Sequence, residues 1–476
     1  MKCLTISLKR TSKKLPEPCL YIEGAESLEV KSPSDFTSKL RLFLDDMKNL
    51  KYLRHIAVET PEALTSDEAL RLQQYAELIP PVIEDIQRSL GESEDSILGI
   101  QNLFENLPTI LKKPDISHIK CTRPFHAVVV SAGPSLDLEI ENLKKIQSKA
   151  ILICVDAAFK TLLKNGIRPQ VVVAMERDDH SVPFFKDLPS QTDSLLVCHA
   201  TVKRILFESY PGPIATALKY TGPFLWLPFK RARFWTASSS AHLAYRLCGF
   251  WGAESIALVG QDLCYHPKTL QSHADVPDYP EWAAPASFEN RIQQDRAFRA
   301  VGNIIPEVLT NATWSLFSRD YQVIVNEMKV PTFNTSKLGM KIGDIPFIPF
   351  EDWTKRLEAP SSPTLNVVDL NPDFKKDLAA LSNKIEAAKT ALTELKNDLQ
   401  NETFLKNPEG LYEKLPQTPH FIELVLEVVF LDWVKTENLC LNADLESARS
   451  TKRDFLKRAS EGIDRVLRLL PSKLTL

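Results

Sequence analysis

The feature that most constrains the fold is a series of short, almost wholly apolar runs that alternate with helical stretches. The runs lie at 127–130, 150–155, 171–175, 195–198 and 255–259. A strand that is apolar at every position has no polar face, so it belongs in a sheet that is covered on both sides. The alternation of such strands with helices predicts an α/β fold with a doubly wound, mostly parallel sheet.

The strand pattern is confined to the middle of the chain. A chain of 476 residues is expected to hold roughly three domains at about 150 residues each. The residues before the sheet show mixed, mostly helical patterns, and those after it show long helical ones. We therefore expect a mixed or helical N-terminal region (1–120), a central α/β domain (121–351) and a helical C-terminal domain (352–476).

Apolar residues of the C-terminal region repeat at alternating spacings of four and three, which is a heptad seam. The seam residues are Phe374, Leu378, Leu381, Ile385, Ala388, Leu392, Leu395 and Leu399. Further amphipathic helices are expected over 420–442 and 445–470. An intramolecular hairpin or bundle is the favoured interpretation. The alternative is an intermolecular coiled coil, which would make the chain an oligomer.

Charge and cysteine usage exclude several classes of function. The net charge of −3 does not suit a protein that binds nucleic acid through its overall charge. A local basic group is interpreted as a solvated face; it comprises Lys203, Arg204, Lys230, Arg231 and Arg233. The cysteines form no CxxC motif, which predicts reduced thiols and no metal or redox centre. No apolar run reaches the roughly 18 residues of a membrane span, so we expect a cytoplasmic protein.

The turn after the first central strand is the first candidate binding site. It reads Gly133-Pro134-Ser135-Leu136 and precedes a helical stretch. The first N–H groups of a helix lack partners within the helix and carry a partial positive charge. Glycine would let a ligand approach the backbone, and ligands of open α/β sheets bind outside the carboxyl ends of the strands. The turn is therefore a candidate phosphate site, although a purely structural turn would explain the same residues.

Acidic side chains follow the next two strands. Asp156 ends one strand, where its carboxylate could bind a ribose or base, or instead cap the next helix. The other strand is followed by Glu176-Arg177-Asp178-Asp179, which holds more charge than one helix cap needs. We expect Glu176 and Asp179 to face the cleft and to contact sugar hydroxyls or a divalent cation. A solvated loop is the alternative.

Polar residues also follow the last central strand. The sequence Gly260-Gln261-Asp262 places Asp262 at the same edge of the sheet as Asp156. His273 is a candidate general base or hydrogen-bond donor to a phosphate. A solvated histidine is the alternative for this residue and for His266, which lies in the same loop. His199, which ends another strand, is a further candidate for the cleft. Ser239 precedes a helix, where its hydroxyl could cap the helix or bind phosphate.

Taken in order, these motifs resemble the Maf family, the motility-associated factor glycosyltransferases. The resemblance covers about residues 100–345 and includes the flanking groups Asn106-Leu107-Pro108, Gly166-Ile167-Arg168-Pro169 and Phe333-Asn334-Thr335. It implies a central domain of sialyltransferase-like topology that binds a CMP-activated nonulosonic acid, a sialic-acid-like sugar. It also implies transfer of that sugar to a Ser or Thr hydroxyl of a protein such as flagellin.

Carried onto this chain, the resemblance implies an inverting enzyme with no tightly bound cofactor. The backbone N–H groups of Ser135 and Leu136 would hold the donor phosphate, and Asp156 would orient the ribose or base. Asp262 or His273 would accept the proton of the acceptor hydroxyl. Glu176 completes the catalytic set, and the other nucleotide-binding candidates are Gly133, Pro134, Arg177, Asp179, Ser239, Gly260 and Gln261.

Two other hypotheses stay open. The same superfamily includes hydroxymethylpterin diphosphokinases, which bind ATP and a pterin, and the Glu176–Asp179 cluster would suit their Mg²⁺. The helical C-terminal region has no evident purpose in that reaction. A non-catalytic scaffold would keep the fold and bind partners through the heptad helices, but the polar residues at the strand ends argue against a lost site.

The chain departs from the Maf pattern at one loop. The segment Cys264–Leu270 lacks the glycine that is often found before the His273 position in that family. The departure predicts a stiffer loop and puts the fit of donor or acceptor in question.

Overall fold

The computed structural model describes most of the chain in two compact units. The described residues are 4–9, 17–22, 28–29, 32–45, 47–54, 56–58, 65–89, 92–220, 222–236, 238–275, 288–357, 364–367, 374–401, 408–441 and 443–472. One unit comprises Met1–Ile97 and Ile385–Leu470, and the other comprises Leu98–Lys384 and Pro471–Leu476. The boundaries fall inside two helices, α4 (Ser93–Lys112) and α13 (Phe374–Gln400).

The larger unit is built on an eight-stranded sheet of order β11-β10-β9-β8-β7-β6-β12-β15, with every neighbouring pair parallel. This confirms the predicted α/β fold. The central strands are buried at nearly every position, as their apolar sequences require. The strands are β6 (Phe125–Val130), β7 (Ile151–Val155), β8 (Val171–Ala174), β9 (Leu195–His199), β10 (Ile214–Lys219), β11 (Arg233–Phe234), β12 (Ala253–Val259) and β15 (Thr332–Asn334).

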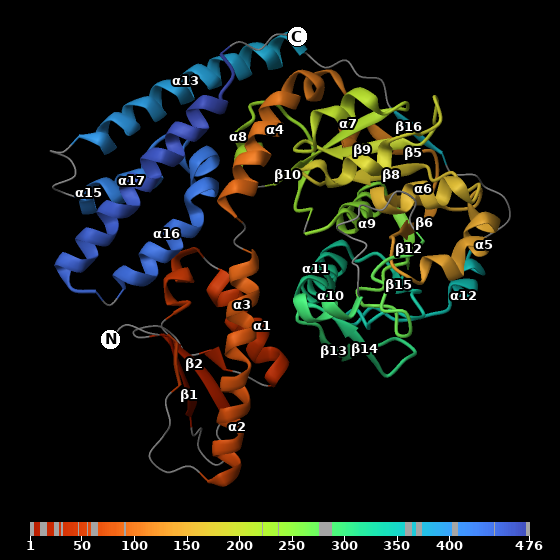
Figure 1. Ribbon diagram of the computed structural model, residues 1–476, viewed down its shortest axis with the longest axis horizontal. Helices are drawn as coiled ribbons and strands as arrows, with labels where there is room; N and C mark the ends of the chain where they lie inside the picture. The colour runs from red at the N-terminus through yellow and green to blue at the C-terminus, as the bar shows by residue number, and fades with distance from the viewer. Residues whose placement is uncertain are drawn as a thin grey trace. The chain divides into compact units, whose positions relative to one another are not determined.

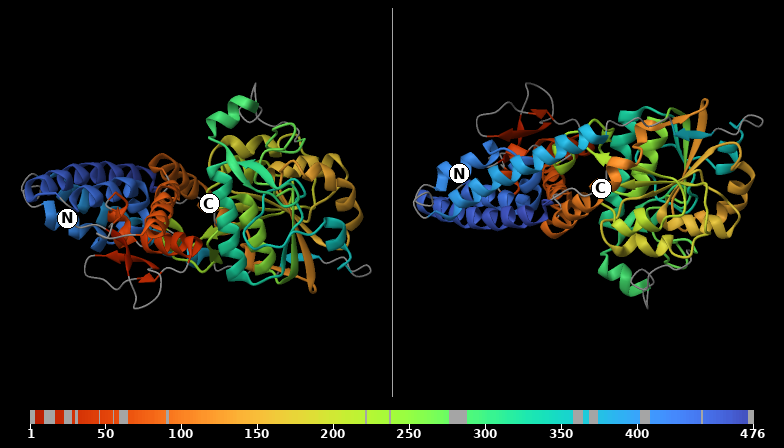
Figure 2. Two further views of the ribbon diagram at one scale, coloured as in Figure 1. Left: turned by 90° about the horizontal axis from the view of Figure 1, so that it is seen from below. Right: turned by 90° about the horizontal axis from the view of Figure 1, so that it is seen from above.

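Helices cover both faces of this sheet (Figure 1), and Figure 2 shows them on either side of the strands. The helices α5 (Leu136–Ile146) and α6 (Asp156–Lys164) follow β6 and β7 as the chain moves toward β11. Helix α9 (Ser240–Phe250) leads back from β11 to β12. Because parallel crossovers are right-handed, this change of direction places α9 on the opposite face from α5 and α6.

The same unit holds shorter elements around the sheet. The helices are α7 (Arg204–Ser209), α8 (Gly222–Trp226), α10 (Phe288–Gln294), α11 (Ala312–Met328) and α12 (Phe350–Thr354), with the 3₁₀ helices η2 (Ile116–His118) and η3 (Asp179–Phe185). Two antiparallel pairs complete it, β13 (Phe298–Val301) with β14 (Glu307–Thr310) and β5 (Ile119–Cys121) with β16 (Leu365–Val367).

Two turns meet at the carboxyl ends of β6 and β12, where the strand order reverses. The backbone N–H of Gly133 donates to the carbonyl of Gly260 at 2.8 Å. A Cβ atom on Gly133 would lie 2.3 Å from Asp262 Oδ2 and 2.5 Å from the Gly260 carbonyl oxygen. Glycine at position 133 therefore allows the chain to approach itself. The sequence analysis did not anticipate this role, in which the glycine makes room for the chain itself.

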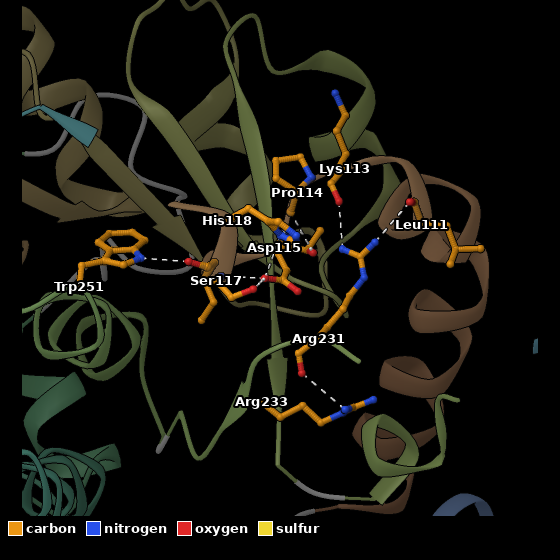
Figure 3. A network of polar contacts seen from close by, with 11 residues as sticks. Leu111, Lys113, Pro114, Asp115, Ser117, His118, Arg231, Arg233 and Trp251 are labelled. Carbon is orange, nitrogen blue, oxygen red and sulfur yellow. Dashed lines mark hydrogen bonds and ion pairs between the residues drawn. The ribbon is translucent and has the colours of Figure 1, made fainter. Parts of the chain in front are cut away.

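Two arginines of the expected solvated basic face bind backbone carbonyls instead (Figure 3). The Arg231 guanidinium donates to the carbonyls of Lys113 at 2.9 Å and Leu111 at 3.2 Å. These carbonyls belong to the end of α4, where a helix lacks internal partners. Arg233 donates in the same way to the carbonyl of Phe224 at 2.9 Å. Both side chains thus stabilise the fold by donating to backbone carbonyls of other segments.

The smaller unit joins the two ends of the chain. Its four-stranded sheet has the order β3-β2-β1-β4, and its helices share a core that includes Phe36, Ile86 and Val434. The Asn438 side chain donates to the Leu50 carbonyl at 3.0 Å and accepts from the Arg54 N–H at 3.0 Å. The expected division at residues 120 and 351 does not anticipate this pairing of distant segments.

In the smaller unit, the C-terminal helices begin and end close to the residues expected from the sequence. The heptad seam is buried within the chain from Leu381 onward, which is the intramolecular arrangement.

Among the described residues, no helix is both long and apolar enough to cross a bilayer. The elements are β1 (Leu4–Lys9), β2 (Glu17–Ile22), β3 (Leu28–Glu29), α1 (Pro33–Asp45), η1 (Met47–Tyr52), β4 (Ile56–Val58), α2 (Ser66–Glu77), α3 (Ile79–Ser89), α15 (Pro408–Lys414), η5 (Leu415–Gln417), the π-helix η6 (Phe421–Val425), α16 (Leu426–Cys440) and α17 (Leu445–Leu469).

We expect Gly133→Ala to destabilise the larger unit by on the order of 2 kcal/mol or more, because the added methyl meets two oxygens of the β12 turn. Gly166→Ala is the matched control. There the new Cβ meets no atom within 4 Å, and only the left-handed φ of +73° opposes it, at a cost of about 1 kcal/mol. Urea unfolding followed by circular dichroism compares the two. Equal losses would contradict the close approach of the turns.

Candidate functional site

A cavity of about 210 Å³ lies at the carboxyl ends of β6, β7, β8 and β12. The turns after β6 and β12 lead away in opposite directions, and such a reversal point leaves a crevice at the sheet edge. The cavity is lined by Ser131, Ala132, Gly133, Val155, Asp156, Ala157, Glu176, Ser238, Ser239, Ser240, Ala241, Gly260, Gln261, Asp262, Leu263, Cys264, Ser272, His273, Trp314 and Phe317.

Many of the site residues proposed from the sequence meet in this cavity. The lining includes Gly133, Asp156, Glu176, Ser239, Gly260, Gln261, Asp262 and His273. It does not include Pro134, Ser135, Leu136, Arg177 or Asp179. Whether a residue lines the cavity depends on its distance from the strand end. Most residues directly at a strand end face the crevice, and those further along lie in the next turn or helix.

Asp262 is fixed in place by one of its two carboxyl oxygens. Its side chain is only 1% exposed, and Oδ2 accepts from the Ser135 N–H at 3.0 Å and the Ser135 hydroxyl at 2.9 Å. The other oxygen, Oδ1, is buried and has no hydrogen-bond partner among the described residues. Burial raises the pKa of Asp262 to about 6, although the Ser135 hydrogen bonds oppose the shift. An acid that ionises near neutral pH thus keeps one carboxyl oxygen for which the described residues supply no hydrogen-bond donor.

The start of α5 is engaged within the protein, which corrects the predicted phosphate cradle. Asp262 occupies the N–H of Ser135, and the N–H of Leu136 donates to the Gly133 carbonyl at 3.0 Å. A buried helix start must satisfy its free N–H groups. Here a carboxylate from the β12 turn does so, in the position that a ligand phosphate was expected to take.

Asp156 is the second acid of the cavity, at the first position of α6. Its Oδ1 accepts from the N–H of Ala157 at 2.9 Å. Burial, and then the negative charge of Glu176, raise the pKa of Asp156 to about 7. The protonated form of this carboxyl is therefore accessible near neutral pH, and it can donate as well as accept hydrogen bonds.

Serine hydroxyls form much of the remaining wall. Ser131 donates to Gln261 Oε1 at 2.6 Å. Ser239 caps α9, since its side chain accepts from the His242 N–H. The predicted capping role of Ser239 is therefore present, and the residue is also among those that line the cavity.

His273 lies in the loop that follows β12, among the residues that line the cavity. Its Nδ1 is 2.9 Å from the Ser272 hydroxyl, and the next residue, Ala274, donates its N–H to the Ala132 carbonyl at 2.8 Å. Burial and the charge of Arg291 lower the pKa of His273 to about 4. The imidazole is neutral at pH 7, so it is a weak base.

The two other candidate histidines have structural roles. His199 is fully buried and lies 2.7 Å from the Thr201 hydroxyl through Nδ1, and burial holds its pKa well below the usual range. His266 Nδ1 accepts from the Lys268 and Thr269 N–H groups at 3.2 and 3.0 Å, which closes the turn of its loop.

The loop between Asp262 and His273 has a strained backbone. Leu263 and Leu270 have φ angles of 51° and 59°, in the left-handed region that favours glycine. Leu270 lies in the segment where the Maf family often has a glycine. The loop therefore has a glycine-like backbone conformation at Leu270 without a glycine there.

The sequence analysis missed the aromatic residues of α11. Trp314 and Phe317 line the cavity from a helix that follows the expected site motifs by some forty residues. The only signal was an aromatic pair at a spacing of three in an amphipathic helix, and a core-facing helix shows the same pattern.

The charge of the lining limits how an anion can be held. No Lys or Arg is among the described lining residues. Within the described part of the chain, no three His, Cys, Asp or Glu side chains converge as a metal site requires. A phosphate would therefore depend on hydroxyls, backbone N–H groups or a cation that arrives with it.

We expect Asp156→Asn to stabilise the protein at high pH but not at low pH. The folded pKa of about 7 exceeds the ordinary value of 3.8, so the wild type loses stability as the pH rises from about 4 to 7, and the amide does not. The gain should reach on the order of 2–4 kcal/mol at pH 8 and vanish near pH 4. Thermal unfolding at both pH values measures it, with the exposed Asp187→Asn as control. A gain that is the same at both pH values would refute the account.

We expect Leu270→Gly to be more stable than Leu270→Ala by about 1 kcal/mol. Both variants lose the leucine side chain, but only glycine removes the left-handed strain. This order is the reverse of the usual one, in which alanine is favoured because glycine gains more entropy on unfolding. Chemical denaturation of the two variants decides the matter, and a more stable alanine variant would show that the loop is not strained.

Comparisons with known proteins agree with this description. Residues 101–268 match the family model described as 6-hydroxymethylpterin diphosphokinase MptE-like. A solved structure, the Maf glycosyltransferase from Magnetospirillum magneticum AMB-1, has a similar fold with a TM-score of 0.51 at 15% sequence identity. The similarity covers 92% of this chain and 67% of that one. No curated protein matches. The chain thus carries an MptE-like segment in its central domain and folds like a Maf glycosyltransferase, the family that its ordered motifs resemble.

Proposed function

We propose that this chain is an inverting glycosyltransferase that moves a nonulosonic sugar from CMP to a hydroxyl acceptor. The observation that carries the proposal is the cavity at the strand-order reversal, with two buried acids, Asp156 and Asp262, whose pKa values lie near neutrality. Acids tuned in this way are typical of proton-transfer sites. The fold shared with a Maf glycosyltransferase supports the reaction class.

Asp262 is the proposed general base. The acceptor oxygen attacks the anomeric carbon, the bond from that carbon to the phosphate oxygen breaks, and CMP leaves with the electron pair. The acceptor proton passes to Asp262 Oδ1, which has no partner among the described residues, while Oδ2 stays bound to Ser135. His273, with a pKa of about 4, is the weaker base and is assigned a hydrogen-bonding role.

The donor is proposed to be held by hydrogen bonds and by a cation rather than by basic side chains. Asp156 in its protonated form can bind the ribose or base, and the serine hydroxyls can bind phosphate oxygens. Glu176 can contact the sugar or a divalent cation, since Mg²⁺ commonly takes one or two carboxylates together with a substrate phosphate. Positioning and stabilisation of the leaving phosphate then supply most of the catalysis.

The second candidate function is an ATP-dependent diphosphokinase of the hydroxymethylpterin type. The family-model match over residues 101–268 favours it, and Asp156 and Glu176 could share a Mg²⁺ ion with ATP. A non-catalytic scaffold is the third candidate, and the buried unpartnered oxygen of Asp262 opposes it, because an abandoned site need not keep such a costly group.

The proposed partners follow from the reaction. A protein acceptor would present a Ser or Thr hydroxyl, as in flagellin, to a cytoplasmic enzyme. The helices of the smaller unit are available for such a partner or for self-association, and nucleic acid is not expected to bind.

Calorimetry with CMP, CTP and Mg·ATP tests the proposal. We expect CMP to bind, and CMP-nonulosonate to be hydrolysed or transferred. Asp262→Asn should keep CMP binding within a few-fold but lower turnover by about 10²-fold or more, as for loss of a general base. The exposed Asp187→Asn is the control and should leave both unchanged. Tight binding of Mg·ATP with AMP release, and none of CMP, would favour the diphosphokinase instead.

A further inference from the structure

One part of the cavity wall is aromatic, and it comes from the first turns of α11. Trp314 and Phe317 are three residues apart, so they lie on one face of the helix. Both side chains are half-buried, and both line the cavity. Among the described lining residues no other Phe, Tyr or Trp is present. Among the described lining residues, only this wall therefore offers a Trp or Phe ring on which a planar ligand could stack.

The Trp314 indole is packed against a second aromatic ring, and its backbone is fixed at the start of α11. It packs against the Tyr265 ring with centroids 4.7 Å apart and planes at 61°. The backbone N–H of Trp314 donates to the side chain of the helix cap Asn311 at 2.9 Å. Phe317 is similarly braced by the His242 ring at 5.7 Å. A platform that is already ordered loses little entropy when a ligand stacks on it.

We propose that Trp314 is the stacking platform for the base of the bound nucleotide, and that it determines how tightly the base is held. The inference rests on the proposed function, because it requires a nucleotide in this cavity. A base is flat and has a π-face, which suits the indole. Ribose and phosphate present oxygens, which suit the hydroxyls of Ser131 and Ser239 and the protonated carboxyl of Asp156.

Trp314 lies far along the chain from the strand-end motifs. The family-model match ends at residue 268, so the platform lies outside the matched segment. Nucleotide selectivity would then be set in part by α11 (Ala312–Met328) and not by the strand-end motifs alone. Two chains with the same strand-end motifs could differ in the base they prefer.

Calorimetry with CMP and with ribose 5-phosphate, which lacks the base, tests this assignment. Trp314→Leu should weaken CMP binding roughly 5- to 100-fold, the range of one lost base stack. Binding of ribose 5-phosphate should change less than about two-fold, because its contacts do not involve stacking. Trp314→Phe keeps a ring and should retain most of the affinity. Trp235→Leu is the matched control, since Trp235 is 39% exposed and is not among the lining residues.

Each outcome decides the proposal. Unchanged CMP binding by Trp314→Leu overturns it, and so does an equal loss for ribose 5-phosphate, which would mean that the indole stacks on a sugar. If Trp314→Leu does not fold, the full-length protein labelled with 5-fluorotryptophan replaces it. The Trp314 resonance, assigned with Trp314→Phe, must then shift with CMP and not with ribose 5-phosphate. If the wild type binds CTP or ATP but not CMP, the proposed donor fails while stacking is still tested with the nucleotide that binds.

Discussion

The hydrogen bonds between Asp262 and Ser135 join two segments that are 127 residues apart in the chain, and the arrangement of the site depends on them. They bring the turn after β12 onto the start of α5, while Gly133 and Gly260 let the two backbones meet. One carboxyl oxygen satisfies the start of the helix, and the other is buried without a partner among the described residues, in a residue that lines the cavity. A single side chain therefore belongs both to the fold and to the proposed chemistry. Substitutions of Asp262 must be interpreted with both roles in mind.

The second constraint is electrostatic. The cavity holds Asp156 and Asp262 with pKa values of about 7 and 6, and no described lining residue is basic. Two dissociated carboxylates would repel a phosphate, whereas Asp156 in its protonated form can donate a hydrogen bond to the ligand. The site is thus suited to a ligand that combines hydroxyl groups with a base to stack, and it is poorly suited to a polyphosphate without a cation. This balance favours a nucleoside monophosphate donor over the ATP of the diphosphokinase hypothesis.

Much of the fold could be predicted from the sequence, because continuous apolar strands admit few arrangements. The expected runs correspond to β6, β7, β8, β9 and β12. The edge strands β11 and β15 are too short to show a pattern, and β10 alternates alanine with larger residues, which obscured its run. The sheet edge that carries the cavity was also predictable, since parallel strands end at one edge. The use of the α5 N–H groups was not, because Asp262 reaches them only through the tertiary fold. Trp314 was missed because a site-facing and a core-facing aromatic have the same helical spacing.

The central claim is that the cavity at the reversal point binds a nucleotide while Asp262 keeps its place at the start of α5. A crystal structure of the full chain with CMP tests this most directly. The account predicts the nucleotide between the strand-end turns and α11, with Asp262 still bound to Ser135. A phosphate at the Ser135 N–H with Asp262 displaced, or CMP bound elsewhere on the protein, would contradict it.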